Sequence, residues 1–297
     1  MHPTTSLDPM LSAAAHGRIC ATAATTQRGL SALAGRYPEL FPAPPFDPTL
    51  LHSLALATAF LSPDMSTDRL GVASRSGLLV FALDWQFDHV AKTAAEVEEL
   101  AAACLLVAQG GEPQPGDPVA PFLASLRDEL AAAPAFASTR HLWLTELRLM
   151  LAAMTQEWYW RPANSGEAAP PSLDTYLDNA ASAGSSLINV AHWIVGAEPG
   201  EFDEPADLVD ASRSVQRALR LLNDLATYER DLRSGDVNAL RVAGRDEVMA
   251  RLDEVTEESR DRLRRLTDRF PEQADYLNRQ LGFTGGFYRV GDFWDSK

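Results

Sequence analysis

The sequence lacks the patterns that specify β-strands, and this restricts its fold more than any other feature. No run of β-branched residues alternates with polar ones, and no Asn-Gly pair suggests a hairpin turn. Segments rich in alanine and leucine, long enough to form helices, instead alternate with clusters of proline and glycine. Those clusters fall at 41–45, 110–118, 162–171 and 197–205. The pattern predicts an all-α protein.

The positions of the helices follow from the spacing of apolar residues and from residues that can cap a helix. Ser66 can cap one helix, and Ser172 can cap another that follows two prolines. Residues 1–45 are expected to be an N-terminal segment with partial flexibility. We expect a single domain over 1–297, built as a bundle of about ten helices. The predicted helices span roughly 50–62, 67–91, 93–108, 119–132, 138–160, 173–195, 206–234, 245–269 and 271–282.

The charge of the chain excludes several classes of function. Its 297 residues include 26 Lys+Arg and 41 Asp+Glu, a formal net charge of −15, with 46% hydrophobic residues. General binding to nucleic acid requires a basic surface, so no nucleic-acid partner is expected. Attraction to anionic lipids is excluded for the same reason. An anionic ligand would have to be held locally, by a few arginines or through bound cations.

Cysteine content and hydropathy predict a cytoplasmic protein. The two cysteines, Cys20 and Cys104, cannot form a disulfide framework and show no metal-binding spacing. The longest apolar stretches, such as 78–83, are far shorter than the roughly 20 residues of a membrane span. The N-terminus has no basic patch followed by an apolar run, so no secretory signal is expected.

Two carboxylates follow the apolar segment 78–83 and form the first candidate site. Asp84 and Asp88 are four residues apart, so a helix places both on one face, about 6 Å apart along its axis. Two buried carboxylates repel each other and lose hydration, which favours a cation between them. Mg²⁺ suits hard oxygen ligands of this kind. The alternative is that both are surface acids beyond the end of the buried segment.

The predicted helix 206–234 carries a second polar stripe. Asn223, Thr227 and Asp231 recur every four residues and cover about 12 Å of one face. They offer an amide, a hydroxyl and a carboxylate oxygen, a weak set that would bind Mg²⁺ well when an anion shares the metal. Arg230 can donate to a phosphate directly. The alternative is the ordinary polar face of an amphipathic helix.

Taken together, these motifs resemble those of class I terpene synthases. Residues 223–231 match the pattern (N/D)Dxx(S/T)xx(K/R)(D/E) at every specified position, and 81–88 resembles the setting of the family's Asp-rich motif. The separation of about 140 residues between the motifs is typical of the bacterial enzymes. The resemblance extends over roughly 50–295 and implies an all-α bundle around a central apolar pocket.

The sequence departs from the family pattern at three places. Trp85 stands where the second aspartate of the Asp-rich motif is usual, so the first metal site should depend on Asp84 with Asp88 in support. The segment 176–181 lacks the arginine that senses the diphosphate in many members. At the C-terminus, Tyr288 and Arg289 occur in the reverse order of the usual Arg-Tyr pair. The diphosphate is therefore expected to contact Arg230, Arg289 and Tyr288.

The resemblance also implies a reaction. A prenyl diphosphate would bind through about three Mg²⁺ ions, ionise, and form a cyclic terpene through a carbocation. Geranylgeranyl diphosphate or a bicyclic C20 derivative is favoured, with C15 possible, and a homodimer is common in the family. Asp84, Asp88, Phe81 and Trp85 are the expected catalytic residues. The expected pocket consists of Phe81, Trp158, Trp193, Phe287 and Trp294.

Two other functions are compatible with the same scaffold. A prenyl chain-elongating synthase would need a second Asp-rich motif and basic residues, whereas the chain has an Asn/Thr/Asp stripe and two lysines, Lys92 and Lys297. A non-catalytic helical protein is the other alternative. Aromatic residues of the pocket also have a plain role in core packing, and His192 is expected to be a core histidine rather than a base.

Overall fold

Local caps explain where many of the helices begin. Asp47 accepts a hydrogen bond from the Leu50 amide at 2.8 Å, and Ser172 accepts one from the Thr175 amide at 3.2 Å. Thr93 and Glu96 form a reciprocal capping box. Ser66 stands at the expected N-cap position but makes no side-chain cap bond.

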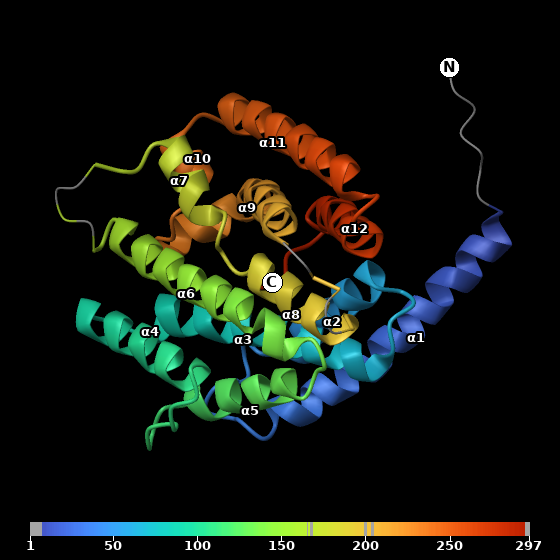
Figure 1. The fold of residues 1–297 in the computed structure, drawn as a ribbon. Coiled ribbons are helices and arrows are strands. Elements are labelled where there is room, and N and C mark those ends of the chain that lie inside the picture. The colour runs from blue at the N-terminus through green and yellow to red at the C-terminus, as the bar shows by residue number, and fades with distance from the viewer. Residues whose placement is uncertain (1–7, 165, 167–168, 199–200, 203–204, 295–297) are drawn as a thin grey trace.

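The computed structural model describes residues 8–164, 166, 169–198, 201–202 and 205–294. The regular secondary structure of these residues is entirely helical, with turns and loops between the helices (Figure 1). The all-α prediction is therefore confirmed. None of the helices in this part of the chain is both long and apolar enough to cross a membrane. The helices are α1 Pro9–Ala34, α2 Pro48–Leu61, α3 Thr67–Trp85, a π-helix Gln86–Val90, α4 Ala94–Ala108, α5 Ala120–Ala131, α6 Phe136–Trp160, α7 Leu173–Ala180, α8 Ser185–Gly196, α9 Ala206–Ser234, α10 Ala239–Val242, α11 Arg245–Leu266 and α12 Pro271–Phe287.

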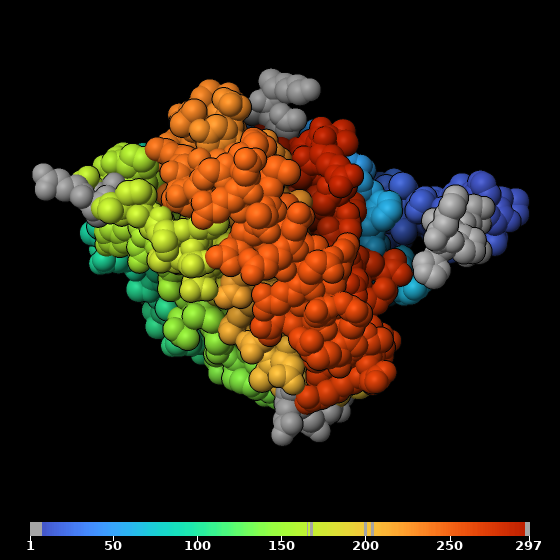
Figure 2. Space-filling view, turned by 90° about the horizontal axis from the view of Figure 1, so that it is seen from above, coloured from blue at the N-terminus to red at the C-terminus, as the bar shows by residue number. Residues whose placement is uncertain are grey.

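The long helix α9 lies near the middle of the bundle. It packs against α11 and α12 on one side and against α7 and α8 on the other (Figure 1). Figure 2 shows α11, in orange, and α12, in red, closing one face of the molecule. Helix α8 also packs against α3, and α3 in turn contacts α1, α2 and α5. The two helices that carry the candidate motifs, α3 and α9, thus both pack against α8.

Helix α1 is an element that the sequence analysis did not predict. It buries Ile19, Ala23, Thr26, Leu30 and Leu33, which recur at alternating steps of three and four residues. Small residues interrupt this stripe, so its apolar signal is weak. The stripe packs against α2 and α3, while the first turns of α1 project from the bundle (Figures 1 and 2).

Two predicted helices are interrupted in the structure. The predicted helix 67–91 changes at Gln86 into a π-helix, in which the Ala91 amide donates to the Gln86 carbonyl at 2.9 Å. The predicted helix 173–195 is two helices, α7 and α8, separated at Gly184. This glycine has φ +118°, and a Cβ atom there would lie 2.6 Å from Cγ1 of Val80. Only glycine fits that conformation and that contact.

Candidate active site

The first pair of carboxylates is placed at the junction of α3 and the π-helix. Burial, followed by repulsion from Asp236 and Glu157, raises the pKa of Asp84 to about 6. Burial and the nearby charge of Asp84 raise the pKa of Asp88 well above its usual value. By accessible surface both residues are half-buried, and 26% of the Asp88 side chain is exposed, so they lie at the edge of the core. An excess of buried negative charge favours a bound cation.

The second stripe lies on α9 as the spacing predicted, and two of its three side chains, Thr227 and Asp231, bond to each other. Thr227 Oγ1 donates to Asp231 Oδ2 at 2.6 Å, and Asn238 Nδ2 donates to the same oxygen at 2.8 Å. Asn223 Nδ2 donates to the Tyr288 hydroxyl at 2.9 Å. Within the described residues the Asn223 amide oxygen accepts no hydrogen bond, so it is available as a ligand.

The oxygen atoms of these side chains suit a hard divalent cation that is also bound by an anion. In the part of the chain that the structure describes, no group of three carboxylate, histidine or cysteine side chains could hold a metal by itself. Mg²⁺ commonly binds through one or two carboxylates together with substrate phosphates and water. The oxygen ligands of Asp84, Asp88 and the α9 stripe fit that mode of binding.

A buried polar network beside the stripe orients α9. The Arg220 guanidinium donates two hydrogen bonds of 3.0 Å to Glu157 and one of 2.9 Å to Asp224. The Tyr176 hydroxyl donates to Asp224 at 2.6 Å, and the Ala239 amide donates to the same carboxylate at 2.9 Å. Asp224 therefore holds α9 to α7 and α10, and Arg220 holds it to α6. Neither Arg220 nor Asp224 was predicted from the sequence as a site residue.

Arg161 links the two candidate metal sites, and sequence reasoning also missed it. It is the C-cap of α6, with its side chain 13% exposed. The guanidinium pairs with the carboxylates of Asp88 and Asp236, the latter at 2.7 Å. The Asp236 amide in turn donates to the Asp231 carbonyl at 2.9 Å. The available signal was an arginine at a helix end, directly after Trp158-Tyr159-Trp160.

The three residues expected to contact a diphosphate have different environments. Arg230 pairs with Asp231 at 3.1 Å and with Asp292 near the C-terminus. Tyr288 is joined to the stripe through Asn223. Arg289 is exposed and forms no hydrogen bond or ion pair with the described residues. The structure thus brings Arg230 and Tyr288 to the second motif and leaves Arg289 outside it.

The aromatic residues separate into two groups. Phe81 lies 5.5 Å from Phe293 and 5.1 Å from Trp294, measured between ring centroids. Phe287 lies 4.6 Å from Phe293, and Trp85 lies 6.3 Å from Trp294. Four of the expected pocket or catalytic aromatics are therefore gathered beside the first motif.

The remaining two expected pocket residues are outside this group. Trp193 packs at 6.3 Å against Phe202, and Trp158 packs at 5.4 Å against its neighbour Tyr159. His192 is a core residue whose ring nitrogen Nε2 lies 2.6 Å from Ser62 Oγ. Burial lowers the pKa of His192 to about 3, so the imidazole is neutral.

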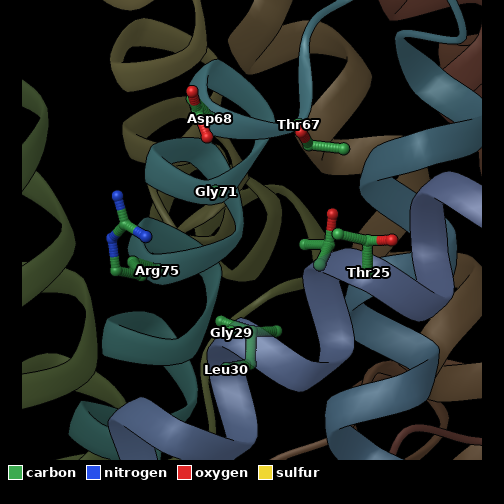
Figure 3. Close-up of a pocket in the computed structure, with 8 residues that line it drawn as sticks. Thr25, Gly29, Leu30, Thr67, Asp68, Gly71 and Arg75 are labelled. Atoms are coloured by element: carbon green, nitrogen blue, oxygen red, sulfur yellow. The ribbon is translucent and has the colours of Figure 1, made fainter.

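An open hollow of about 320 Å³ lies elsewhere, between α1 and the first turns of α3 (Figure 3). Thr25, Thr67, Asp68 and Arg75 are among its lining residues. None of its lining residues belongs to either motif. The chemistry of the motifs and this hollow are therefore separate features.

Comparisons with known proteins agree with the geometry. Residues 76–270 match the family model described as terpene synthase family 2, C-terminal metal binding. An ent-pimara-9(11),15-diene synthase from Streptomyces sp. (strain KO-3988) is 27% identical over 275 residues, 90% of each chain.

Solved structures share the fold. A wild-type cucumene synthase has a TM-score of 0.71 at 18% identity, over 91% of this chain and 96% of that one. The 2-methylisoborneol synthase from Streptomyces coelicolor A3(2), solved with Mg²⁺ and 2-fluoroneryl diphosphate, has a TM-score of 0.71 at 16% identity, over 97% and 93%. The match to the family model extends over more than half of the sequence, and the chain therefore belongs to the terpene synthase family.

Proposed function

We propose that this protein is a Mg²⁺-dependent class I terpene synthase that ionises a C20 prenyl diphosphate and forms a cyclic terpene with release of diphosphate. The observation that supports this most is that one guanidinium, of Arg161, reaches both Asp88 and Asp236. Asp236 lies just beyond the α9 stripe, so the two metal motifs are close enough to act on one ligand.

The two carboxylates of the first motif and the stripe on α9 would bind metal on opposite sides of the diphosphate. Asp84 and Asp88 would hold metal on one side of the diphosphate, and Asn223, Thr227 and Asp231 on the other, for about three ions in total. Bound Mg²⁺ would supply neutralisation of the diphosphate as a leaving group. Arg230 and Tyr288 would donate hydrogen bonds to phosphate oxygens, with Arg289 as a further donor from the C-terminal turn.

The aromatic group beside Asp84 would contact the hydrocarbon part of the substrate. Phe81 lies one turn before Asp84 and packs against the rings of Phe293 and Trp294. Aromatic faces attract a desolvated cation by about 2 kcal/mol or more. Phe81, Trp85, Phe287 and Trp294 would therefore stabilise the carbocation and exclude water from it. Trp158 and Trp193 stay candidates for the outer wall of the pocket.

The preference for C20, already made from the sequence, is supported by the relative named ent-pimara-9(11),15-diene synthase. The name of this relative does not state its substrate, so both a linear and a bicyclic C20 diphosphate are tested. Geranyl, farnesyl and geranylgeranyl diphosphates and a bicyclic C20 diphosphate should be incubated with the protein, with and without Mg²⁺. Products should be analysed by gas chromatography and released diphosphate should be quantified.

A cyclic C20 hydrocarbon formed only with Mg²⁺ is the expected result. A prenyl diphosphate longer than the one supplied would indicate chain elongation instead. No turnover of any substrate would contradict the proposal and favour a non-catalytic protein. A cyclic C15 product would keep the reaction class but overturn the preferred chain length.

A further inference from the structure

We propose that Arg161 is a diphosphate-binding residue, held on Asp88 in the free enzyme and transferred to the substrate when that carboxylate binds a metal. This inference rests on the proposed function. It gives the site a cation that neither motif contains, and it assigns a role to a side chain that pairs with both Asp88 and Asp236.

The contacts of Arg161 divide into two kinds. One terminal nitrogen, NH1, donates to the backbone carbonyl of Asp88 at 2.9 Å. The other, NH2, pairs with the Asp88 carboxylate and with Asp236 Oδ1 at 2.7 Å. The carbonyl is not among the expected metal ligands, whereas the Asp88 carboxylate is. Loss of the Asp88 carboxylate would therefore leave NH2 with one carboxylate partner in place of two, while NH1 and the bond to Asp236 keep the guanidinium in place.

The other arginines near the motifs are less suited to this exchange. Arg220 is tied to Glu157, to Asp224 and, at 3.1 Å, to the Val237 carbonyl, none of which is an expected metal ligand. Arg230 is paired with Asp292 as well as with Asp231. Arg289 is exposed and outside the site. Among these, Arg161 alone pairs with a carboxylate of the first motif.

Electrostatics predicts the direction of the exchange. A guanidinium and a divalent cation on one carboxylate repel each other, and at a few ångströms this repulsion is large where water is excluded. Arg161 then keeps Asp236 but loses its second carboxylate, and a guanidinium that is mostly buried is stabilised by an anion that replaces it. The planar fork of a guanidinium matches the oxygens of a phosphate. A diphosphate that shares the metal would be the nearest such anion.

The test is the binding of inorganic diphosphate and of Mg²⁺ to the full chain, by titration calorimetry. For Arg161→Gln, the affinity for inorganic diphosphate in saturating Mg²⁺ should fall about ten- to a hundred-fold, the loss expected for hydrogen bonds to a charged group. The affinity for Mg²⁺ alone should stay the same or rise, because a competing cation has been removed. Arg161→Lys keeps the positive charge but lacks the planar guanidinium, so its affinity for diphosphate should fall less.

Arg127→Gln provides the matched control. Arg127 also pairs with an aspartate, Asp128, and donates to a backbone carbonyl, that of Val107 at 2.7 Å. It lies on α5, away from both motifs, so its loss should leave both affinities unchanged. Thermal unfolding of each variant reports whether it is folded.

Three results are decisive. An Arg161→Gln variant that binds inorganic diphosphate as well as the wild type would overturn the proposal. Equal losses of Mg²⁺ and diphosphate affinity in both Arg161 variants would overturn it too, since they would show only a structural support for Asp88. If the wild type itself binds no diphosphate with Mg²⁺, the proposed function fails, which is distinct from a failure of Arg161 alone.

Discussion

Arg230 of the second motif is ion-paired with Asp292, 62 residues further along the chain. The pair fastens the C-terminal segment to α9. Phe293 and Trp294 follow directly and lie against Phe81 of α3. The C-terminal segment thus connects the proposed diphosphate site with the aromatic group beside the first motif.

Asp292→Asn should strengthen the binding of inorganic diphosphate. In the structure the Asp292 carboxylate pairs with Arg230, which is proposed to bind the diphosphate. The asparagine carries no charge, so it would compete less with the diphosphate for Arg230. We expect the affinity in saturating Mg²⁺ to rise several-fold, measured by titration calorimetry. Unchanged or weaker binding would show that Arg230 does not exchange Asp292 for the diphosphate.

Removal of a ligand from either motif should abolish turnover. Asp84→Ala and Asn223→Ala should each lower kcat/KM for the C20 substrate by a hundred-fold or more, because each side of the diphosphate would lose a metal ligand. Steady-state release of diphosphate is the measurement. Asp253→Asn, on the exposed face of α11, is the control and should retain full activity. Full activity of the Asp84 variant would exclude the first motif as a metal site.

Phe81→Ala should change the products more than the rate of ionisation. The ring packs against Phe293 and Trp294, and Phe81 stands three residues before Asp84 in α3. We expect Mg²⁺-dependent release of diphosphate to continue while the hydrocarbon profile shifts, as measured by gas chromatography. Phe81→Tyr, which keeps the ring, is the matched comparison. An unchanged profile in the alanine variant would remove Phe81 from the mechanism.

The half-buried carboxylate Asp84 predicts a pH-dependent difference in stability. Its pKa in the folded protein, about 6, is above the value of 3.8 for an exposed aspartate, so the folded state holds the proton more tightly. This contribution to stability is complete near pH 4 and is lost as the pH rises through 6. In a chelator, Asp84→Asn should therefore match the wild-type Tm at pH 4 and exceed it at pH 8. A Tm difference that is independent of pH would contradict the buried environment.

Gly184→Ala should destabilise the fold at the break between α7 and α8. The residue has φ +118°, and the new Cβ atom would lie 2.6 Å from Val80 Cγ1. We expect a loss of about 1–3 kcal/mol in the free energy of unfolding, measured with denaturant. Gly282→Ala is the control, because that position in α12 has open space and should gain about 0.5–1 kcal/mol. A neutral Gly184 variant would show that the break can relax.

Most of the helices and both motif stripes could be predicted from the sequence. Periodicity and helix caps depend on residues within one or two turns of each other, so α6, α9 and the spacing of Asn223, Thr227 and Asp231 can be read from the chain itself. The missed helix α1 has the same periodicity but carries small residues on its buried face. The π-helix was missed because its hydrogen bonds span one residue more than those of an α-helix, a change that does not alter the apolar pattern of so short a segment.

Contacts between distant residues were decided by the tertiary structure alone. Arg161 meets Asp88 and Asp236 across 73 and 75 residues, and Arg230 meets Asp292 across 62. The local sequence around each arginine predicts a helix end or a polar helix face, not the identity of its partner. That identity depends on which helices pack together, and packing depends on the shapes and volumes of side chains throughout the core. Local sequence thus sets which polar side chains each helix carries, whereas the fold decides which of them face one another.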